Sequence, residues 1–499
     1  MKAKKKLPFQ LVTLAFICAM FFPRVIPEGM YFDGLFYANI ARDMAFGTGT
    51  FWHPHYLVTH LGDSIASYSS FFGHPTLGPW LLSGCYGVFG DYWFVEKGFC
   101  VLVWAMTVLL VAKLWLLDVG STVSTPRRAD WWLPIFIWYC MPVVLWSYPY
   151  FLLDNVMGVF SLAAAIGLLG RLSVQANGAG KDWRSWVGGY FLPIVFLHFA
   201  FLAKGPVGLY PLSIPFIYAC VYPKRLPIGR GLRDSVFLGL ATGVSLCLWL
   251  FYGPARLFWQ NYFHTQILSS VGQNEQTVAY SWKDYTLVLQ NLGVSALPGI
   301  GLGIILWICV KAAGAEMIVA PESRKRAVFY FSVAMSGSLP MLVSHKTSWY
   351  YLIPCLPFLA MGFGALFETA VRDLVDGFVL SKEKRRIGKA ILWSLCVGVF
   401  VYCFSLIGTV GREKDLIHDL KILANVIPKH TNIGFPGSLM GDYTFHNYFE
   451  RYGEWTLQSA NDTLGYRVAF KGDSETHDLH YSKVGVSGLK LFEVYVLKR

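Results

Sequence analysis

Long apolar stretches constrain this chain more than any other feature of its sequence. Several of them reach the roughly 20 residues that a helix needs to cross the hydrocarbon core of a bilayer. Only 14% of the 499 residues are charged and 55% are hydrophobic, whereas soluble domains carry about 25% charged residues. The sequence therefore predicts an all-α polytopic membrane protein. We expect eleven spans, near residues 7–23, 97–117, 131–147, 150–171, 186–203, 206–222, 233–253, 287–311, 327–344, 349–369 and 388–408.

Basic residues predict the orientation of these spans. Lysines precede the first apolar stretch, and because no small-residue cleavage site follows it, we interpret it as a retained helix. Further basic clusters lie in alternate loops, around Arg127, Arg184, Arg225, Arg324 and Arg385. Since positive loops stay in the cytoplasm, we expect a cytoplasmic N-terminus and, with an odd number of spans, an external C-terminus. The net charge of +12 is then a topology signal and not a nucleic-acid patch.

The chain divides into two predicted domains. Residues 1–410 form the transmembrane domain, whose first external loop, residues 24–96, is long. Within this first loop, Phe36, Tyr37, Ile40 and Met44 recur at helical spacing, which predicts an amphipathic helix lying flat on the membrane. A second surface helix is expected from about residue 75 to 89.

Residues 411–499 form the second predicted domain, because the apolar pattern ends there. Leu416 to Ile427 reads as an amphipathic helix, and residues 467–470 and 491–496 read as strands. We expect a small α/β domain on the external side. The ten cysteines of the chain lie in or beside apolar segments at no metal-type spacing.

Two aspartates are candidate catalytic groups. Asp33 precedes aromatic, helix-periodic sequence just beyond the first span, and Asp154 stands at the outer entrance of a span. An ionisable group inside a span is by default a functional hypothesis, because its desolvation costs a few kcal/mol. Asp33 has an equally weighted alternative as a helix N-cap. The alternative for Asp154 is a buried salt bridge or a capped helix end.

Several cationic and aromatic residues on the same predicted face are candidate ligands for substrate. Lys204 lies on a Lys-Gly-Pro turn, and Lys346 follows His345 between two spans. Several cations meeting at one face would bind phosphate, although a lysine on such a turn is often only reaching the headgroups. His53 and His55 are separated by one proline, which is a weak metal signal. No set of candidate ligands in the sequence requires a cofactor, and binding of a divalent cation stays an open alternative.

Four motifs in order resemble the GT-C superfamily of polyprenyl-phosphate-sugar glycosyltransferases. They are Asp33 with Tyr37-Ala38-Asn39-Ile40-Ala41-Arg42-Asp43-Met44, then Gly73-His74-Pro75-Thr76-Leu77, then Ala203-Lys204-Gly205-Pro206, and last Ser344-His345-Lys346 before Tyr351-Leu352-Ile353-Pro354. Asp154 falls where the family has its second acidic residue. The likeness covers roughly residues 8–370. It is strongest to the lipid A aminoarabinose transferases, the lipid A-core galacturonosyltransferases and the bacterial relatives of protein mannosyltransferases.

The chain departs from that pattern at three positions. Gly34 replaces the Glu that often follows the first Asp, His74 stands where the aminoarabinose transferases have Lys, and Thr76 replaces the second Pro. These departures favour the broader branch of the family, whose acceptor differs from member to member.

The resemblance implies a bacterial inner-membrane glycosyltransferase with a periplasmic active site. It would transfer a sugar from polyprenyl (undecaprenyl) phosphate to lipid A, a polysaccharide or a protein, with inversion. Asp33 would be the base, and Asp154 would orient a hydroxyl or assist the base. Lys204, Lys346, His74 and His345 would hold the donor phosphate, while Tyr37, His53, His55 and Tyr350 would bind acceptor or sugar.

Two alternatives from other classes stay open. One is a flippase or transporter for a lipid-linked sugar, against which stand the missing inverted repeat and the few charges deep in spans. The other is a ligase or polymerase that uses a polyprenyl diphosphate donor, although such families place their large external loop late in the chain.

Overall fold

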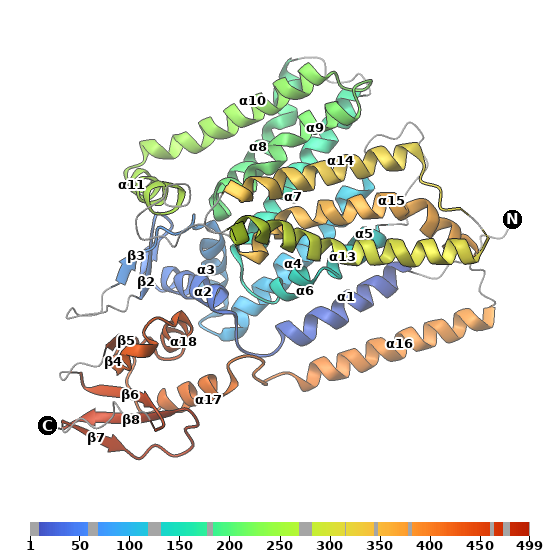
Figure 1. The fold of residues 1–499 in the computed structure, drawn as a ribbon. Helices are drawn as coiled ribbons and strands as arrows, with labels where there is room; N and C mark the ends of the chain where they lie inside the picture. Colours follow the sequence, from blue (N-terminus) through green and yellow to red (C-terminus); the bar gives the residue numbers. More distant parts are fainter. Residues whose placement is uncertain are drawn as a thin grey trace.

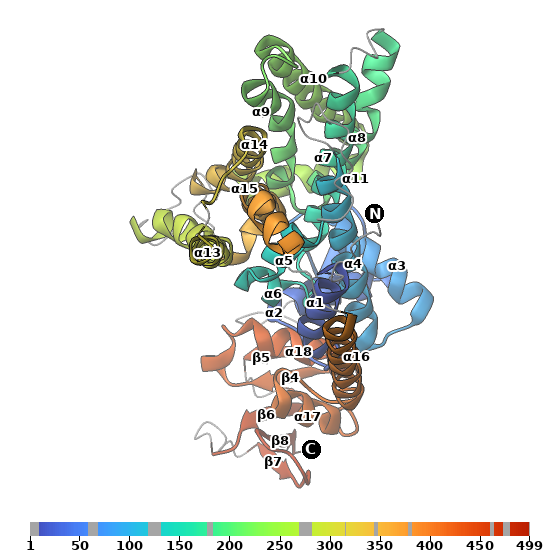
Figure 2. The same cartoon turned by 90° about the vertical axis from the view of Figure 1, so that its right-hand side faces the viewer.

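The computed structural model describes ten stretches of the chain. They are residues 9–57, 68–117, 131–176, 183–268, 282–314, 316–343, 348–377, 382–459, 464–472 and 480–498. Helices run side by side through most of the molecule, and the C-terminal segment lies at one end of them, against the first loop (Figures 1 and 2). We call this end of the bundle the outer end.

Eighteen helical elements build the bundle. They are α1 (Phe9–Val25), α4 (Trp93–Leu116), α5 (Trp132–Tyr139), α6 (Pro142–Ser147), α7 (Leu153–Ala176), α8 (Trp183–Lys204), η1 (Pro206–Ser213), α9 (Ile214–Val221), α10 (Ile228–Cys247), η2 (Leu248–Phe251), α11 (Gly253–Tyr262), η3 (Phe263–Leu268), α13 (Trp282–Ala312), α14 (Pro321–Ser338), η4 (Leu339–Val343), η5 (Trp349–Cys355), α15 (Leu356–Gly377) and α16 (Lys382–Ser405).

Seven helices of the described chain are long and apolar enough to cross a membrane, so this is a multi-pass membrane protein. They are α4, α7, α8, α10 with η2, α13, η5 with α15, and α16. The other four predicted spans fall on the shorter α1, the pair α5–α6, the pair η1–α9, and α14, which begins with charged residues. Prolines explain two of these breaks, because Pro142 starts α6 and Pro206 starts the 3-10 helix η1.

The first loop carries two helices and a small sheet at the outer end. These are α2 (Phe32–Ala45) and α3 (Leu77–Phe89), with the antiparallel strands β1 (Gly49–Thr50), β2 (His53–Leu57) and β3 (Tyr68–Ser70) between them. The two predicted surface helices are therefore present. However, the polar face of α2 is not in contact with water. Asn39, Arg42 and Asp43 on that face are buried, because α2 packs between α3 and the C-terminal segment.

The C-terminal segment has the predicted α/β character. It contains α17 (Lys414–Leu423), β4 (Asn432–Phe435), η6 (Gly437–Leu439), α18 (Tyr443–Gly453), β5 (Thr456–Ser459), β6 (Tyr466–Phe470), β7 (Tyr481–Val484) and β8 (Phe492–Leu497). The sheet order is β5-β4-β6-β8-β7, with β4 parallel to β5 and β6 and the other pairs antiparallel. Phe435, Phe449 and Phe492 pack together where α18 covers the sheet.

Candidate active site

Asp154 and Lys204 meet at the outer end of the bundle. Because α7 and α8 are antiparallel neighbours, the start of α7 and the end of α8 lie together. The Nζ atom of Lys204 lies 2.5 Å from Oδ2 of Asp154, and both side chains are buried. An acid in the first turn and a cation in the last turn also match the two helix dipoles. The buried salt bridge that was the alternative interpretation of Asp154 is therefore present.

Glycine and proline shape the turn that ends α8. Gly205 has a φ of +105°, and a Cβ atom there would lie 2.2 Å from the Tyr262 hydroxyl. Only glycine therefore fits, both for the backbone conformation and for the space. Pro206 then starts η1, where its missing N–H costs nothing. The turn stops the helix directly after Lys204 and keeps its ammonium group beside Asp154.

Asp33 lies in the first turn of α2 and not at its N-cap. The helix begins at Phe32, and the capping residue is Tyr31. The carboxylate of Asp33 instead accepts a hydrogen bond from the Tyr350 hydroxyl, more than 300 residues away in sequence. The N-cap alternative is therefore wrong. Burial raises the pKa of Asp33, while the Tyr350 hydrogen bond and the charge of Lys204 oppose that rise.

Gly34 brings Asp33 close to the start of α7. A Cβ atom on Gly34 would lie 3.1 Å from the backbone nitrogen of Phe151 and 3.0 Å from the sulfur of Met30. A side chain at this position would therefore require these neighbours to shift by a few tenths of an ångström. The departure at Gly34 is thus explained by close packing.

Aromatic rings connect the two acids. Lys204 Nζ lies 3.8 Å from the ring centroid of Tyr351 and 5.5 Å from that of Tyr350, both cation–π distances. Tyr37 projects from α2 one turn after Asp33, and its ring lies 6.1 Å from that of His74. The structure thus brings together the predicted Asp33, Tyr37, His74, Asp154, Lys204 and Tyr350.

The other predicted site residues contact different partners or lie outside the described residues. His53 and His55 on β2 pair with each other, with 2.7 Å between His55 Nε2 and His53 Nδ1, and His53 also contacts Ser70. His345 and Lys346 lie outside the described residues. Within the described stretches, no group of three or more His, Cys, Asp or Glu side chains could hold a metal ion.

Three residues near the site were missed by the sequence argument. Tyr351 contacts Lys204, Arg412 lies 5.4 Å from the ring centroid of Tyr31, and the buried Lys97 lies 5.5 Å from that of Tyr150. The Glu96-Lys97 pair at the start of an apolar span is a signal that could have singled out Lys97.

Comparison with known proteins rests on structure alone. No protein-family model and no curated protein matches the chain. The crystal structure of ArnT from Cupriavidus metallidurans bound to undecaprenyl phosphate matches 97% of this chain and 97% of its own, with 13% sequence identity and a TM-score of 0.59. Its apo state gives the same values. The chain has the GT-C fold.

The predicted fold class is therefore confirmed, and at this identity the likeness establishes the fold alone. A second GT-C structure is more distant. The oligosaccharyltransferase AglB from Archaeoglobus fulgidus, in complex with an inhibitory peptide and a dolichol-phosphate, covers 92% of this chain and 69% of its own. Its sequence identity is 10% and its TM-score is 0.47.

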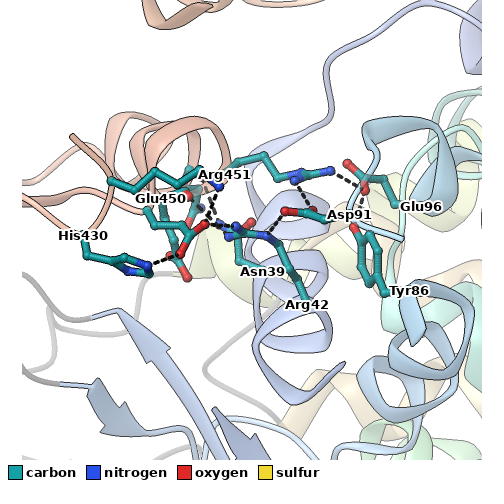
Figure 3. Close-up of polar contacts among 11 residues, drawn as sticks. Asn39, Arg42, Tyr86, Asp91, Glu96, His430, Glu450 and Arg451 are labelled. Carbon is teal, nitrogen blue, oxygen red and sulfur yellow. Dashed lines mark hydrogen bonds and ion pairs between the residues drawn. The ribbon is translucent and has the colours of Figure 1, made fainter. Parts of the chain in front are cut away.

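A buried ionic network ties the C-terminal segment to the first loop (Figure 3). Asp91 bridges two arginines, with Arg42 Nε of α2 at 2.8 Å and Arg451 Nη1 of α18 at 2.7 Å. Arg42 also pairs with Glu454, and Arg451 with Glu96, at 2.8 and 3.4 Å. Burial raises the pKa of Asp91, but the two arginines outweigh it and hold the pKa below its ordinary value. The network fixes the helix that carries Asp33.

Replacing Asp91 should loosen this junction. In Asp91→Asn two buried guanidinium groups lose their shared carboxylate, which should cost about 1–3 kcal/mol. We expect faster amide hydrogen exchange in α18 without unfolding of the bundle. The matched control is Lys483→Gln. It breaks an exposed ion pair with Glu493, between strands β7 and β8 of the C-terminal sheet. Unchanged exchange in α18 of Asp91→Asn would show that apolar packing alone holds the junction.

Proposed function

We propose that this protein transfers a sugar from a polyprenyl phosphate to an acceptor hydroxyl at the outer face of the membrane. The observation that carries the proposal is the meeting of Asp33, Asp154 and Lys204, from three separate helices, around the rings of Tyr350 and Tyr351. The GT-C fold supports it, and so does the solved ArnT structure, which holds undecaprenyl phosphate.

The proposed reaction is a single displacement with inversion. The acceptor oxygen forms a bond to the anomeric carbon, and its proton passes to the carboxylate of Asp33. The bond between the anomeric carbon and the phosphate oxygen breaks, and its electron pair leaves with the polyprenyl phosphate. A buried carboxylate with a raised pKa is a stronger base than an exposed one while it stays ionised.

Lys204 and Asp154 have separate roles in this proposal. The leaving phosphate gains negative charge, which Lys204 would stabilise in a water-poor site, with His74 and the predicted His345 and Lys346 contributing. Asp154 holds Lys204 through Oδ2, while its Oδ1 is buried and has no hydrogen-bond partner among the described residues. That oxygen is the one we assign to a sugar or acceptor hydroxyl, since a buried acceptor atom without a partner is costly.

Tyr350 should set the pH at which the base works. The carboxylate of Asp33 acts only when ionised, so activity should fall as the pH drops through its pKa. Tyr350→Phe removes the hydrogen bond that lowers this pKa, so the acid limb of the kcat/KM profile should move to higher pH, by about one unit. Tyr92→Phe, at an exposed position, is the control. If the acid limb does not move, the hydroxyl of Tyr350 does not control the pKa of the catalytic base.

We further propose that the outer end faces the periplasm of a bacterial inner membrane and that the N-terminus is cytoplasmic. The basic loops support this orientation. In a variant without native cysteines, Ser482→Cys in β7 should react with an impermeant maleimide in cells whose outer membrane is permeabilised. Glu383→Cys at the start of α16 should react only after lysis. The reverse pattern would invert the topology and place the site in the cytoplasm.

A gene deletion would test the function as a whole. We expect mass spectrometry of the lipid A, glycoprotein and polysaccharide fractions to show one sugar mass missing from one of them. The wild-type gene should restore that mass. If all fractions keep every sugar while a lipid-linked sugar accumulates on the cytoplasmic leaflet, the protein moves its substrate and does not transfer it.

A further inference from the structure

An apolar groove runs between α1 and α16. Its volume is about 700 Å³, and every lining side chain is apolar or a cysteine. Small residues of α1, Ala15 and Ala19, face Val399 and Phe400 of α16 across it. The two helices lie side by side at the edge of the bundle (Figures 1 and 2), and most side chains of α16 are exposed. The groove therefore has the shape and chemistry to hold an acyl or prenyl chain that enters from the bilayer.

A separate basic pocket of about 420 Å³ lies next to the groove, at the outer ends of α1 and of the segment that follows α16. On α1, Phe22 and Ile26 line the groove while Arg24, on the same helical turn, lines the pocket. Beyond α16, Ile407 lines the groove and Arg412 lines the pocket. An apolar surface and a cationic surface thus lie next to each other, which is the combination that an anionic amphiphile requires.

The charges around this basic pocket favour an anion. Glu28 also lines it, but its carboxylate is buried and is paired with Lys421 at 2.5 Å and with the Tyr452 hydroxyl at 2.5 Å. Arg24 and Arg412 each carry five N–H donors. One N–H group of Arg24 donates to the Met20 carbonyl oxygen, and Nε of Arg412 lies 3.5 Å from Oε1 of Glu413. Both guanidinium groups therefore keep donors for a phosphate or carboxylate.

Aromatic rings link the basic pocket to the proposed base. Trp146 and Tyr150 line the pocket, and the ring of Trp146 lies 5.9 Å from that of Tyr350. Tyr350 donates its hydroxyl hydrogen to Asp33. Two aromatic rings, those of Trp146 and Tyr350, therefore connect a head group held by the two arginines to the carboxylate of Asp33.

We propose that the groove and basic pocket bind the acceptor, and that the acceptor is an anionic amphiphile with a free hydroxyl in its head group. This inference rests on the proposed function and narrows its acceptor class. The donor phosphate is assigned to Lys204, whose Nζ atom lies 5.5 Å from the ring centroid of Tyr350, so both substrates would approach Asp33 near that ring. The acceptor hydroxyl loses its proton to Asp33 as its oxygen bonds to the anomeric carbon and the polyprenyl phosphate leaves.

Binding is tested with lipids that carry bromine, which quenches tryptophan on contact. Dibrominated phosphatidic acid and phosphatidylcholine with identical chains are titrated into the purified full chain. The signal of Trp146 is the difference between wild type and Trp146→Phe. We expect the acidic lipid to quench Trp146 at a concentration about tenfold below the zwitterionic one, as a charge-assisted bond predicts. Arg24→Gln with Arg412→Gln should remove that preference, while Arg386→Gln, at the opposite end of α16, should keep it.

The groove has its own matched pair of variants. Ala15→Trp fills it and should weaken binding of both lipids, whereas Leu11→Trp, at an exposed position of α1 outside the lining, should not. Equal quenching of Trp146 by the two lipids, or an unchanged preference in the double arginine variant, would overturn the proposal, because lipids that merely surround the protein show no such dependence.

Transfer kinetics separate this inference from the proposed function. With labelled polyprenyl-phosphate sugar and host lipids divided into anionic and zwitterionic fractions, label should enter the anionic fraction. The double arginine variant should raise the KM for that fraction about tenfold and leave the donor KM unchanged. Transfer to protein or to zwitterionic lipid, or a raised donor KM, would overturn the acceptor assignment while the transferase stands. No transfer to any fraction would overturn both.

Discussion

Asp33→Asn should abolish most transfer while leaving the protein folded. The substitution keeps the shape of the side chain and can still accept the Tyr350 hydrogen bond, but it removes the proton acceptor. The rate should fall by about 10²–10⁴-fold, the usual contribution of a general base. Because Asp33 does not cap α2, the melting temperature should change little.

The measurement is the transfer rate with saturating donor, beside the thermal unfolding curve in the same detergent. Asp415→Asn, which breaks an exposed pair with Lys490 in the C-terminal segment, controls for the loss of one carboxylate. An Asp33→Asn protein with full activity would remove the base from the proposed reaction, and the assignment would pass to Asp154.

Breaking the Asp154–Lys204 pair should cost both stability and activity. Lys204→Met leaves a buried carboxylate without its partner, which should lower the free energy of unfolding by about 3–5 kcal/mol. Adding Asp154→Leu removes the unpaired charge, and because well-packed apolar residues often replace a buried pair without loss, the double variant should recover most of the stability. It should stay inactive, since the cation for the leaving phosphate is gone.

A second buried pair offers a matched comparison. Arg326 of α14 and Glu368 of α15 lie 2.5 Å apart and are as buried as the first pair. Glu368 lies late in α15, about three turns beyond η5, the element that holds Tyr350, so this pair is remote from Asp33. Arg326→Met should therefore lose stability and, at temperatures where it is folded, keep its transfer rate. If Lys204→Met also keeps its rate and its donor KM when folded, the pair is structural and phosphate binding lies elsewhere.

Local patterns in the sequence predicted most of the helices in the membrane domain but not the positions at which some of them are interrupted. Hydropathy over about 20 residues identifies a helix that must be buried in lipid or protein, but it does not distinguish these two surroundings. Three of the predicted spans fall on the shorter helices α1, α5–α6 and η1–α9, and the fourth falls on α14, whose first turns contain Arg324, Lys325 and Arg326. Periodicity likewise identified α2 but not the partner of its polar face, since α18 follows some 400 residues later.

The sequence by itself determined the membrane class, the α/β character of the C-terminal segment, and the residue types that could perform chemistry. These follow from local composition, helical spacing and the conformational demands of Gly205 and Pro206. Only the tertiary structure decided which of those residues meet. The hydrogen bond of Asp33 to Tyr350, the burial of Arg42 against Arg451 and Asp91, and the pocket between Arg24 and Arg412 each join segments distant in sequence. Such contacts arise from packing of helices in three dimensions, and no local pattern in the chain encodes them.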